Sequence, residues 1–354
     1  MIASRPMAPA GRQLDTGSQS ATTRQRATGR QYATRRQFAA GLAATLAAAD
    51  AACNRGGKKR VAVIPKGTSH IFWLTVQAGA VAAGQEYQFD ILWNGPATET
   101  DYSRQIQILD SYIAQRVDGI VIAASDRKAL VGPIDRAMAA GIPVTVFDSG
   151  LDSTNYISYV ATDNKEAGRM GAREMGRLLG GKGKIGVVQH LPGSVSTTDR
   201  EDGFTEVIEK EFPGIKIAAR QFGMSDRSKS MAAAENMMTA HADLDAFFCS
   251  TEPSATGTAL AVKSRGLTGK VKIVAFDSNE SMIADMRGGV IQAMVVQDPF
   301  QIGFQAVGTI RDKLEGRTPP KQINLEGRVI TPENLDKPDV QKLLTPDLKK
   351  YLGA

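Results

Sequence analysis

The sequence predicts an α/β protein made of two doubly wound lobes, each with a parallel sheet covered by helices on both faces. From Arg60 onward, short apolar runs rich in β-branched residues alternate with segments of helical character. This alternation ends near residue 161 and then starts again, so two such series follow each other along the chain. The length of 354 residues is comfortable for two domains.

The first series contains five apolar runs that predict strands. Their residues are 60–64, 89–93, 119–124, 142–147 and 156–161. Helices are expected between them at 73–86, 101–115 and 130–140. Continuous apolar runs, rather than alternating ones, are typical of parallel strands that are buried on both faces.

The second series repeats this pattern. Strands are expected at 184–189, 215–220, 245–250, 272–276 and 291–296. Helices are expected at 163–179, 199–210, 228–240, 254–265 and 280–287. Because every strand is followed by an amphipathic segment, the second lobe is expected to have the same architecture as the first.

The two series set the expected domain boundaries. The first lobe is expected to comprise residues 60–162 and 298–326, and the second lobe residues 163–297 and 327–340. Residues 341–354 are expected to form a C-terminal tail. The chain would then cross between the lobes near Ala161–Asp163, Val296–Pro299 and Gly327–Val329, and these crossings are the expected multi-strand hinge.

Residues 1–59 form a leader that differs from the body in charge. Residues 1–60 carry eleven Lys or Arg and two Asp, whereas the rest of the chain carries 32 basic and 35 acidic side chains. The basic excess therefore belongs to the leader, and the body gives no support for a nucleic-acid surface.

The leader also has the pattern of an export signal. Arg35 and Arg36 precede Phe38–Ala49, which are twelve residues without a charge. This run is too short for a permanent membrane span and suits the apolar region of a twin-arginine signal peptide. Cys53 then resembles the acceptor cysteine of a lipoprotein, but Asp50 departs from that pattern, so the sequence leaves lipidation of Cys53 open.

Polar and aromatic side chains follow most of the predicted strands. In open parallel sheets, ligands bind beyond the carboxyl ends of the strands. Carboxylates and amides there suit the hydroxyls of a sugar, and aromatic rings suit its C–H faces. Phe72 and Trp73 have two possible roles, as the first core residues of the following helix or as the apolar wall of a binding site. A loop position without a ligand contact is expected for His190.

Five segments carry a resemblance to a known family. They are "ATDN" (161–164), "TTDREDGF" (197–204), "DRSKSMAAAENMMTAHADLDAFF" (226–248), "KIVAFDS" (272–278) and "VVQDPFQIG" (295–303). In their order and spacing, they resemble the periplasmic ribose-type sugar-binding proteins that serve ABC importers. The resemblance covers about Arg60 to Ile330 and implies the type 1 fold of periplasmic binding proteins, which lac-repressor-type effector domains share.

The resemblance also implies a set of ligand-binding residues. By position, Phe72 and Trp73 match stacking aromatics, Asp148 and Asp277 match hydroxyl-binding carboxylates, and Arg200 matches an arginine that binds the ring or anomeric oxygens. Gln297 matches an amide that completes the ring of donors and acceptors. The predicted ligand-binding residues are His70, Phe72, Trp73, Asp148, Ser149, Arg200, Ser225, Thr251, Asp277 and Gln297.

Four of these positions depart from the family's pattern. His70 and Thr251 stand where the family commonly has asparagines, and Ser149 stands where ribose binders have an arginine. Ser225 falls where an aromatic usually stacks from the second lobe, so this wall of the site is either missing or supplied by Phe222 or Met224. The departures leave the class of ligand intact and argue against ribose itself.

The expected function is an extracytoplasmic receptor that binds a neutral monosaccharide between its lobes and delivers it to the permease of an ABC importer. We expect a periplasmic monomer without cofactor, metal or nucleic-acid partner, whose one membrane contact would be a lipid at Cys53. A sensor that presents its sugar to a membrane receptor is an alternative that the sequence does not separate from transport. A sugar-responsive repressor would need a helix-turn-helix, which residues 1–59 do not offer, and no catalytic pair can be assembled for an enzyme.

Overall fold

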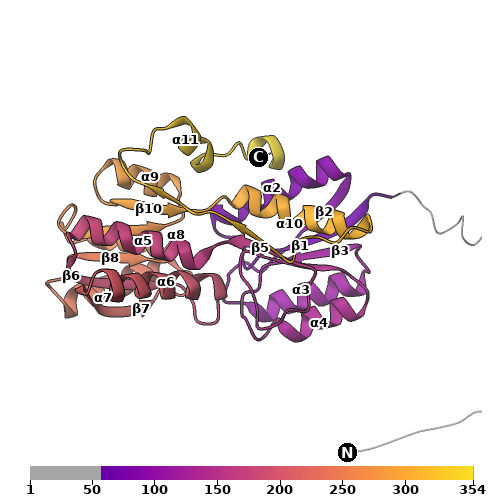
Figure 1. The fold of residues 1–354 in the computed structure, drawn as a ribbon, viewed down its shortest axis with the longest axis horizontal. Coiled ribbons are helices and arrows are strands. Elements are labelled where there is room, and N and C mark those ends of the chain that lie inside the picture. Colours follow the sequence, from indigo (N-terminus) through magenta and orange to yellow (C-terminus); the bar gives the residue numbers. More distant parts are fainter. Residues whose placement is uncertain (1–56, 354) are drawn as a thin grey trace, which may run out of the picture. The chain divides into compact units, whose positions relative to one another are not determined.

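The computed structural model describes residues 57–353, and Arg35, Arg36 and Cys53 of the leader lie outside the described residues. Residues 58–353 form one compact unit, which contains two sheets (Figure 1). Among the described residues, no helix is both long enough and apolar enough to cross a bilayer.

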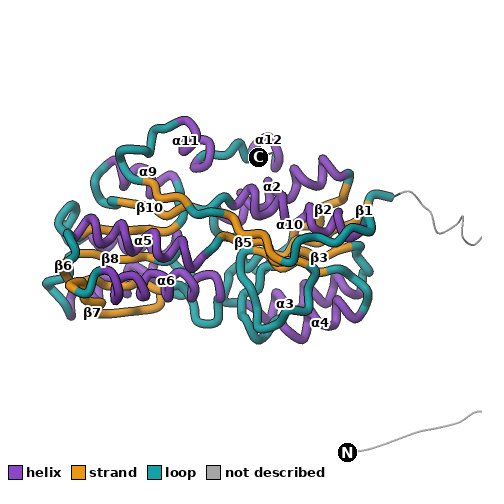
Figure 2. Tube along the Cα trace, viewed as in Figure 1, coloured by secondary structure: helices purple, strands orange, loops and turns teal. Residues whose placement is uncertain are grey.

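The first lobe contains a six-stranded parallel sheet in the order β11-β5-β4-β3-β1-β2 (Figure 2). Its strands are β1 (Lys59–Ile64), β2 (Phe89–Trp93), β3 (Gly119–Ile122), β4 (Val144–Phe147), β5 (Ser158–Thr162) and β11 (Gln322–Leu325). Its helices are α2 (Ile71–Tyr87), α3 (Tyr102–Ala114), α4 (Val131–Ala139) and α10 (Pro299–Leu314).

The second lobe contains a sheet in the order β12-β10-β9-β8-β6-β7, which is parallel except for the edge strand β12. Its strands are β6 (Lys182–Gln189), β7 (Gly214–Phe222), β8 (Ala246–Cys249), β9 (Lys272–Phe276), β10 (Ala293–Val296) and β12 (Arg328–Ile330). Its helices are α5 (Asn164–Leu179), α6 (Val195–Glu211), α7 (Arg227–Ala240), α8 (Glu252–Ser264) and α9 (Glu280–Arg287).

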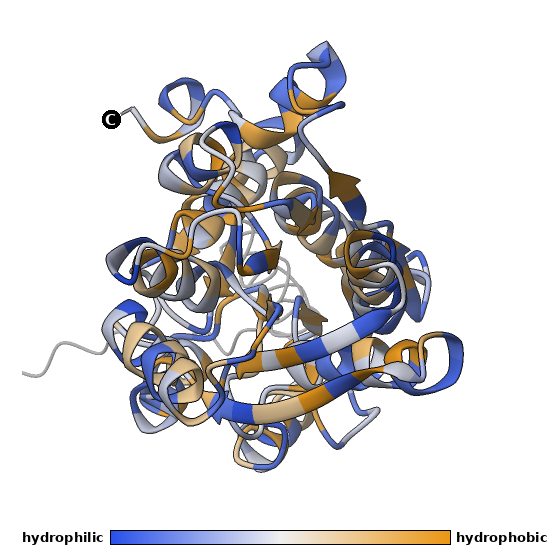
Figure 3. Ribbon diagram, turned by 90° about the vertical axis from the view of Figure 1, so that its left-hand side faces the viewer, coloured by the Kyte–Doolittle hydropathy of each residue, from blue (hydrophilic) through white to orange (hydrophobic). Residues whose placement is uncertain are grey.

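The continuous apolar strands are explained by cores on both faces of each sheet. In β1, Val61 and Val63 pack with α2 and α10, whereas Ala62 and Ile64 pack with α3 and α4. In β6, Val187 packs with α5 and α6, and Val188 packs with α7 and α8. Because successive side chains point to opposite faces, a strand between two helical layers must be apolar at every position. Hydrophilic and hydrophobic positions alternate along the helices that cover the sheets (Figure 3).

The chain passes between the two sheets three times. It leaves β5 at Thr162 to begin α5, leaves β10 at Val296 to begin α10, and leaves β11 at Leu325 to begin β12. Strands β11 and β12 and helix α10 were not among the elements predicted from the sequence. The two strands have four and three residues and are only half-buried, so they lack a continuous apolar run.

The C-terminal segment contacts both lobes. It contains α11 (Pro338–Leu344) and α12 (Lys349–Leu352). Val340 of α11 is buried in the core of the second lobe, whereas the ring of Tyr351 in α12 packs on Phe300 of the first lobe with a centroid distance of 5.3 Å. Residues 338–352 therefore lie across the side of the unit where the sheets meet.

A glycine contact fixes the position of the helix that carries Arg200. Gly168 of α5 faces the backbone carbonyl of Arg200, and Gly203 of α6 faces the backbone carbonyl of Lys165. A Cβ atom at either glycine would collide with that carbonyl, so the two helices cross in backbone contact. Because α6 follows β6, its N-terminal half lies at the carboxyl ends of the second sheet, and the crossing with α5 holds it there.

Candidate ligand-binding site

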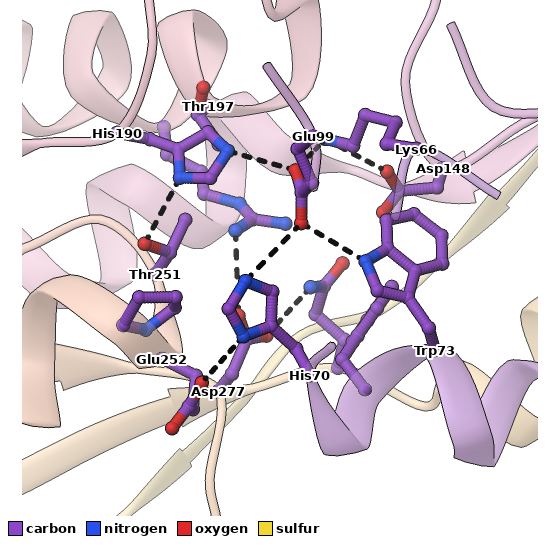
Figure 4. Close-up of a pocket in the computed structure, with 14 residues that line it drawn as sticks. Lys66, His70, Trp73, Glu99, Asp148, His190, Thr197, Thr251, Glu252 and Asp277 are labelled. Carbon is purple, nitrogen blue, oxygen red and sulfur yellow. Dashed lines mark hydrogen bonds and ion pairs between the residues drawn. The ribbon is translucent and has the colours of Figure 1, made fainter. Parts of the chain in front are cut away.

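A cavity lies where the carboxyl ends of the two sheets meet, and fourteen residues line it (Figure 4). The first lobe contributes Lys66, His70, Phe72, Trp73, Glu99 and Asp148. The second lobe contributes His190, Thr197, Arg200, Thr251, Glu252, Pro253 and Asp277, and Gln297 lies where the chain leaves β10 to cross between the lobes. Eight of the ten residues predicted from the sequence line the cavity, and Ser149 and Ser225 do not.

Asp148 and Asp277 occupy equivalent places in the two lobes. Each follows a buried strand, β4 or β9, and each has a left-handed backbone, with φ of 56° for Asp148 and 63° for Asp277. Aspartate tolerates this region better than most residues, although at a cost in backbone energy. Local strain of this kind is concentrated at ligand-binding sites.

Lys66 is a buried cation of the cavity that the sequence analysis missed. Its side chain is 4% exposed, and its Nζ lies 3.3 Å from Asp148 Oδ2 and 3.7 Å from Glu99 Oε2. Nζ also donates to the hydroxyls of Ser194 and Ser196, which belong to the second lobe, at 3.3 and 3.4 Å. A buried ammonium needs such partners because desolvation costs several kcal/mol per ion.

Glu99 is a second cavity residue that was missed. Its Oε1 accepts from Trp73 Nε1 at 3.0 Å, and its Oε2 lies 3.0 Å from His190 Nε2 of the other lobe. Burial raises the pKa of the Glu99 carboxyl, but Lys66 and His190 outweigh burial and hold this pKa well below its usual range. Glu99 is therefore a carboxylate that joins the lobes. His190 lies in the loop after β6, as expected, and it lines the cavity.

Trp73 belongs to the core and to the cavity at the same time. It is 2% exposed and packs among Val63, Val76 and Phe147, while the N–H edge of its indole reaches Glu99 in the cavity. Phe72 is half-buried and meets Trp73 edge-to-face at 4.9 Å. Trp73 is therefore both a core residue of α2 and part of the cavity wall. Phe72 is the more accessible of the two rings.

His70 connects the first lobe to two residues of the second. Its Nε2 lies 3.2 Å from Ser225 Oγ, and its Nδ1 lies 3.5 Å from Glu252 Oε2. Burial lowers the pKa of the imidazole, but Glu252 and Glu99 outweigh it and leave the pKa of His70 raised. Ser225, which does not line the cavity, thus contacts it through His70.

Arg200, Asp277 and Gln297 form a second polar group. Arg200 lies over the ring of Phe276 at 3.9 Å, donates to Asn164 Oδ1 at 2.7 Å, and has Nη1 3.8 Å from Asp277 Oδ2. Gln297 donates to Asp277 Oδ1 at 2.7 Å. Burial raises the pKa of the Asp277 carboxyl, and the opposing effects of Arg200 and Gln297 do not cancel the rise.

Two small residues of the predicted set have other environments. Thr251 lines the cavity and caps α8 with Ser254, and its hydroxyl lies 3.3 Å from His190 Nδ1. Ser149 is fully buried, and its hydroxyl accepts from the backbone N–H of Ser196 at 3.3 Å, so its side chain packs behind the cavity wall.

The second lobe contributes no aromatic ring to the lining residues of this cavity. Phe222, one of the two expected replacements for the missing ring at Ser225, is 44% exposed and lies outside the cavity, as does Met224. Phe72 and Trp73 are therefore the aromatic residues of the lining, and Pro253 is its apolar contribution from the second lobe.

The cavity has a volume of about 30 Å³. Pockets for small molecules typically measure about 300–1,000 Å³, so a sugar ring fits only after the lobes separate or the lining side chains move. Among the side chains that line this space, Glu99 pairs with His190 and His70 approaches Glu252 across the two lobes. A ligand must therefore replace some of these contacts with its own polar groups.

Comparisons with known proteins identify the family. The model of the periplasmic binding protein domain matches residues 61–318. The chain belongs to this family. The resemblance and the two-lobed α/β fold inferred from the sequence are thus confirmed.

Individual relatives agree with this family. A D-ribose/D-allose-binding protein of Pseudomonas aeruginosa is 29% identical over 286 residues, which is 78% of this chain and 88% of the relative. A solute-binding protein of an ABC transporter from Agrobacterium vitis, solved with bound D-fucose, is 33% identical with a TM-score of 0.78 and covers 81% of this chain and 100% of its own. A carbohydrate transporter solute-binding protein from Agrobacterium radiobacter, in complex with D-arabinose, is 27% identical with a TM-score of 0.79 and covers 82% of this chain and 100% of its own.

Replacing Trp73 with leucine is expected to reduce the stability of the ligand-free protein. Truncation of a buried aromatic side chain to alanine costs about 3–5 kcal/mol, and leucine keeps part of the volume but loses the N–H donor to Glu99. We expect a loss of about 2–4 kcal/mol in the free energy of unfolding, measured by chemical denaturation. The control is Trp93→Leu in β2, where the side chain is half-buried and a smaller loss is expected. Equal losses would contradict the placement of Trp73 in the core.

Replacing Asp277 with asparagine is expected to stabilise the ligand-free protein at neutral pH. Folding raises the pKa of the Asp277 carboxyl. Such a group destabilises the folded state increasingly as the pH rises from the pKa of the unfolded state through the pKa of the folded state. The amide of Asp277→Asn would keep an acceptor for Gln297 without the charge. The stability difference between variant and wild type should therefore vanish at low pH, where Asp277 is protonated in both states, and grow as the pH rises. Thermal unfolding at a series of pH values measures it, and a variant less stable than wild type at neutral pH would contradict this account.

Proposed function

We propose that this protein is an extracytoplasmic receptor that binds a neutral monosaccharide in the cavity between its lobes and delivers it to the permease of an ABC importer. The observation that carries the proposal is the cavity itself, where Asp148 and Asp277 at equivalent strand ends of the two lobes meet Arg200, Gln297 and the half-buried ring of Phe72. One of the named relatives is a D-ribose/D-allose-binding protein, and the other two are solute-binding proteins solved with a sugar bound.

The chemistry of the lining suits a polyhydroxylated ring. Carboxylates only accept hydrogen bonds, Arg200 only donates them, and Gln297 does both, so hydroxyl groups can pair with each of them. Charge-assisted hydrogen bonds contribute about 1.5–3 kcal/mol each. A few of them are sufficient for a dissociation constant of about 1 μM, which corresponds to about −8.2 kcal/mol, after the costs of ordering are met.

The division of the site between lobes gives a reason for closure. One lobe alone would leave part of the sugar's hydroxyls in water, whereas both together surround it. Opening and closing would bend the chain at its three crossings, after Thr162, Val296 and Leu325. The cavity volume of about 30 Å³ supports this mechanism, because a sugar ring is too large for the space between the lobes as they stand.

A sugar screen tests the proposal. We expect at least one of D-ribose, D-allose, D-arabinose, D-tagatose and D-fucose to raise the melting temperature of the mature protein, because a ligand that binds only the folded state stabilises it. Asp148→Ala should then weaken binding of that sugar by tenfold or more in calorimetry while the protein remains folded. Asp126→Ala is the control, because Asp126 lies outside the cavity lining. A screen without any thermal shift, or an unchanged affinity of the Asp148 variant, would contradict the proposal.

The same proposal places the protein outside the cytoplasm. Its support is the family of the chain together with the leader, in which Arg35, Arg36 and an uncharged run precede the body. We expect the leader to be removed, so that the mature N-terminus lies between Phe38 and Arg60, and the mature protein to be a monomer. If Cys53 carries a lipid, the mature chain begins there and is recovered with membranes. Cell fractionation with N-terminal sequencing measures this, and uncut protein in the cytoplasm would contradict export.

A further inference from the structure

Two buried carboxylate oxygens that face the cavity have no hydrogen-bond partner among the described residues. They are Oδ2 of Asp148 and Oε2 of Glu252. The residues are 3% and 1% exposed, respectively. A buried acceptor without a donor costs about 1–3 kcal/mol, and more when it is charged, so native proteins contain few of them. Asp148 is already part of the proposed site, whereas Glu252 was not among the predicted ligand-binding residues.

The other oxygen of Glu252 is held firmly by the protein. Oε1 accepts from Arg227 Nη2 at 2.7 Å, from Thr256 Oγ1 at 3.0 Å and from Asn279 Nδ2. Three donors on one oxygen fix the carboxylate plane and leave Oε2 directed away from them. Glu252 is also the first residue of α8, where backbone N–H groups favour a negative charge.

Glu252 is ionised as well as fixed. Burial raises the pKa of its carboxyl, but His70 and Arg227 outweigh burial and lower the pKa. A carboxylate accepts hydrogen bonds and donates none. The His70 ring lies beside Oε2, with its Nδ1 3.5 Å away, at the limit of an ordinary hydrogen bond. Among the described residues, Oε2 thus has the His70 ring beside it but accepts no hydrogen bond of ordinary geometry, and it remains available to a donor from a ligand.

We propose that Glu252 is a specificity-determining residue whose Oε2 accepts a hydrogen bond from one hydroxyl of the bound sugar, on the side of the second lobe. This inference rests on the proposed function of the site. Asp148 Oδ2, which has Lys66 Nζ 3.3 Å away but accepts no hydrogen bond, would take another hydroxyl on the side of the first lobe, so the two oxygens together favour a ligand with donors toward both lobes. A ligand with a carboxylate or phosphate facing Glu252 would place like charges together and should be rejected.

The experiment compares the sugar that binds the wild type with its monodeoxy analogues by calorimetry. Glu252→Gln should weaken binding of the parent sugar by tenfold or more, because the amide presents a donor or a weaker acceptor to the hydroxyl. For one deoxy analogue, the one that lacks the hydroxyl at Glu252, wild type and variant should bind equally within about threefold. Such a loss of discrimination at a single position is the signature of a direct contact.

Glu201→Gln is the matched control. Glu201 is a buried glutamate of the same lobe, but its oxygens accept from His190 N, Ser250 Oγ and Gln189 Nε2, and it does not line the cavity. Its replacement should lower the melting temperature and leave the affinity within about threefold. Glu252→Asp retains the charge but moves the carboxylate oxygens away from the cavity, so it should weaken binding of the parent sugar as Glu252→Gln does. It serves as the second variant if Glu252→Gln does not fold.

Two results would overturn the inference. One is an unchanged affinity of Glu252→Gln for the parent sugar. The other is an equal loss for the parent sugar and for every deoxy analogue, which would mean that Glu252 acts only by pairing with His70. If no sugar binds the wild type, the proposed function fails first, and that outcome is distinct from either of these.

Discussion

Buried ionic groups join the two lobes, and neither lobe supplies all of the partners that these groups need. Lys66 of the first lobe donates to Ser194 and Ser196 of the second, and Glu99 pairs with His190 across the same gap. A charge buried without such partners costs several kcal/mol. The lobes can therefore approach each other only in an arrangement that brings opposite charges and donors together. In the cavity, two carboxylate oxygens, Asp148 Oδ2 and Glu252 Oε2, accept no hydrogen bond from the described residues.

Two structural features occur in both lobes: an aspartate with a left-handed backbone after a buried strand, and a helix pair that crosses through glycines. Asp148 and Asp277 each follow a buried strand in a left-handed conformation, which directs a carboxylate from each sheet toward the cavity. Helices α5 and α6 cross through a pair of glycines, and helices α2 and α10 do so through Gly79 and Gly303. Such contacts between backbones fix helix positions without depending on flexible side chains. The ligand-facing groups are thus carried by a rigid framework within each lobe, and movement is left to the three crossings.

The central strands are predictable from the sequence because burial between two helical layers demands an apolar run, and the helices between them are predictable because they are amphipathic. The sequence analysis missed β11 and β12, which are short and half-buried at the edges of their sheets. It also missed Lys66 and Glu99, because a charged residue in a loop is usually solvated and only the fold brings these two together. Their position in the turns after the first two strands was the available signal. Ser149 was included because it follows Asp148, but its hydroxyl contacts the backbone of α6 instead.

The central claim is that one ligand is held by both lobes in the cavity between them. A crystal structure of the mature protein with the sugar that gives the largest thermal shift tests it most directly. The account predicts sugar hydroxyls within hydrogen-bond distance of both Asp148 and Asp277, with Phe72 against the face of the ring. A sugar found instead between α2, α9 and the C-terminal segment, in the neighbouring hollow lined by Thr75, Asn279 and Leu344, would contradict it.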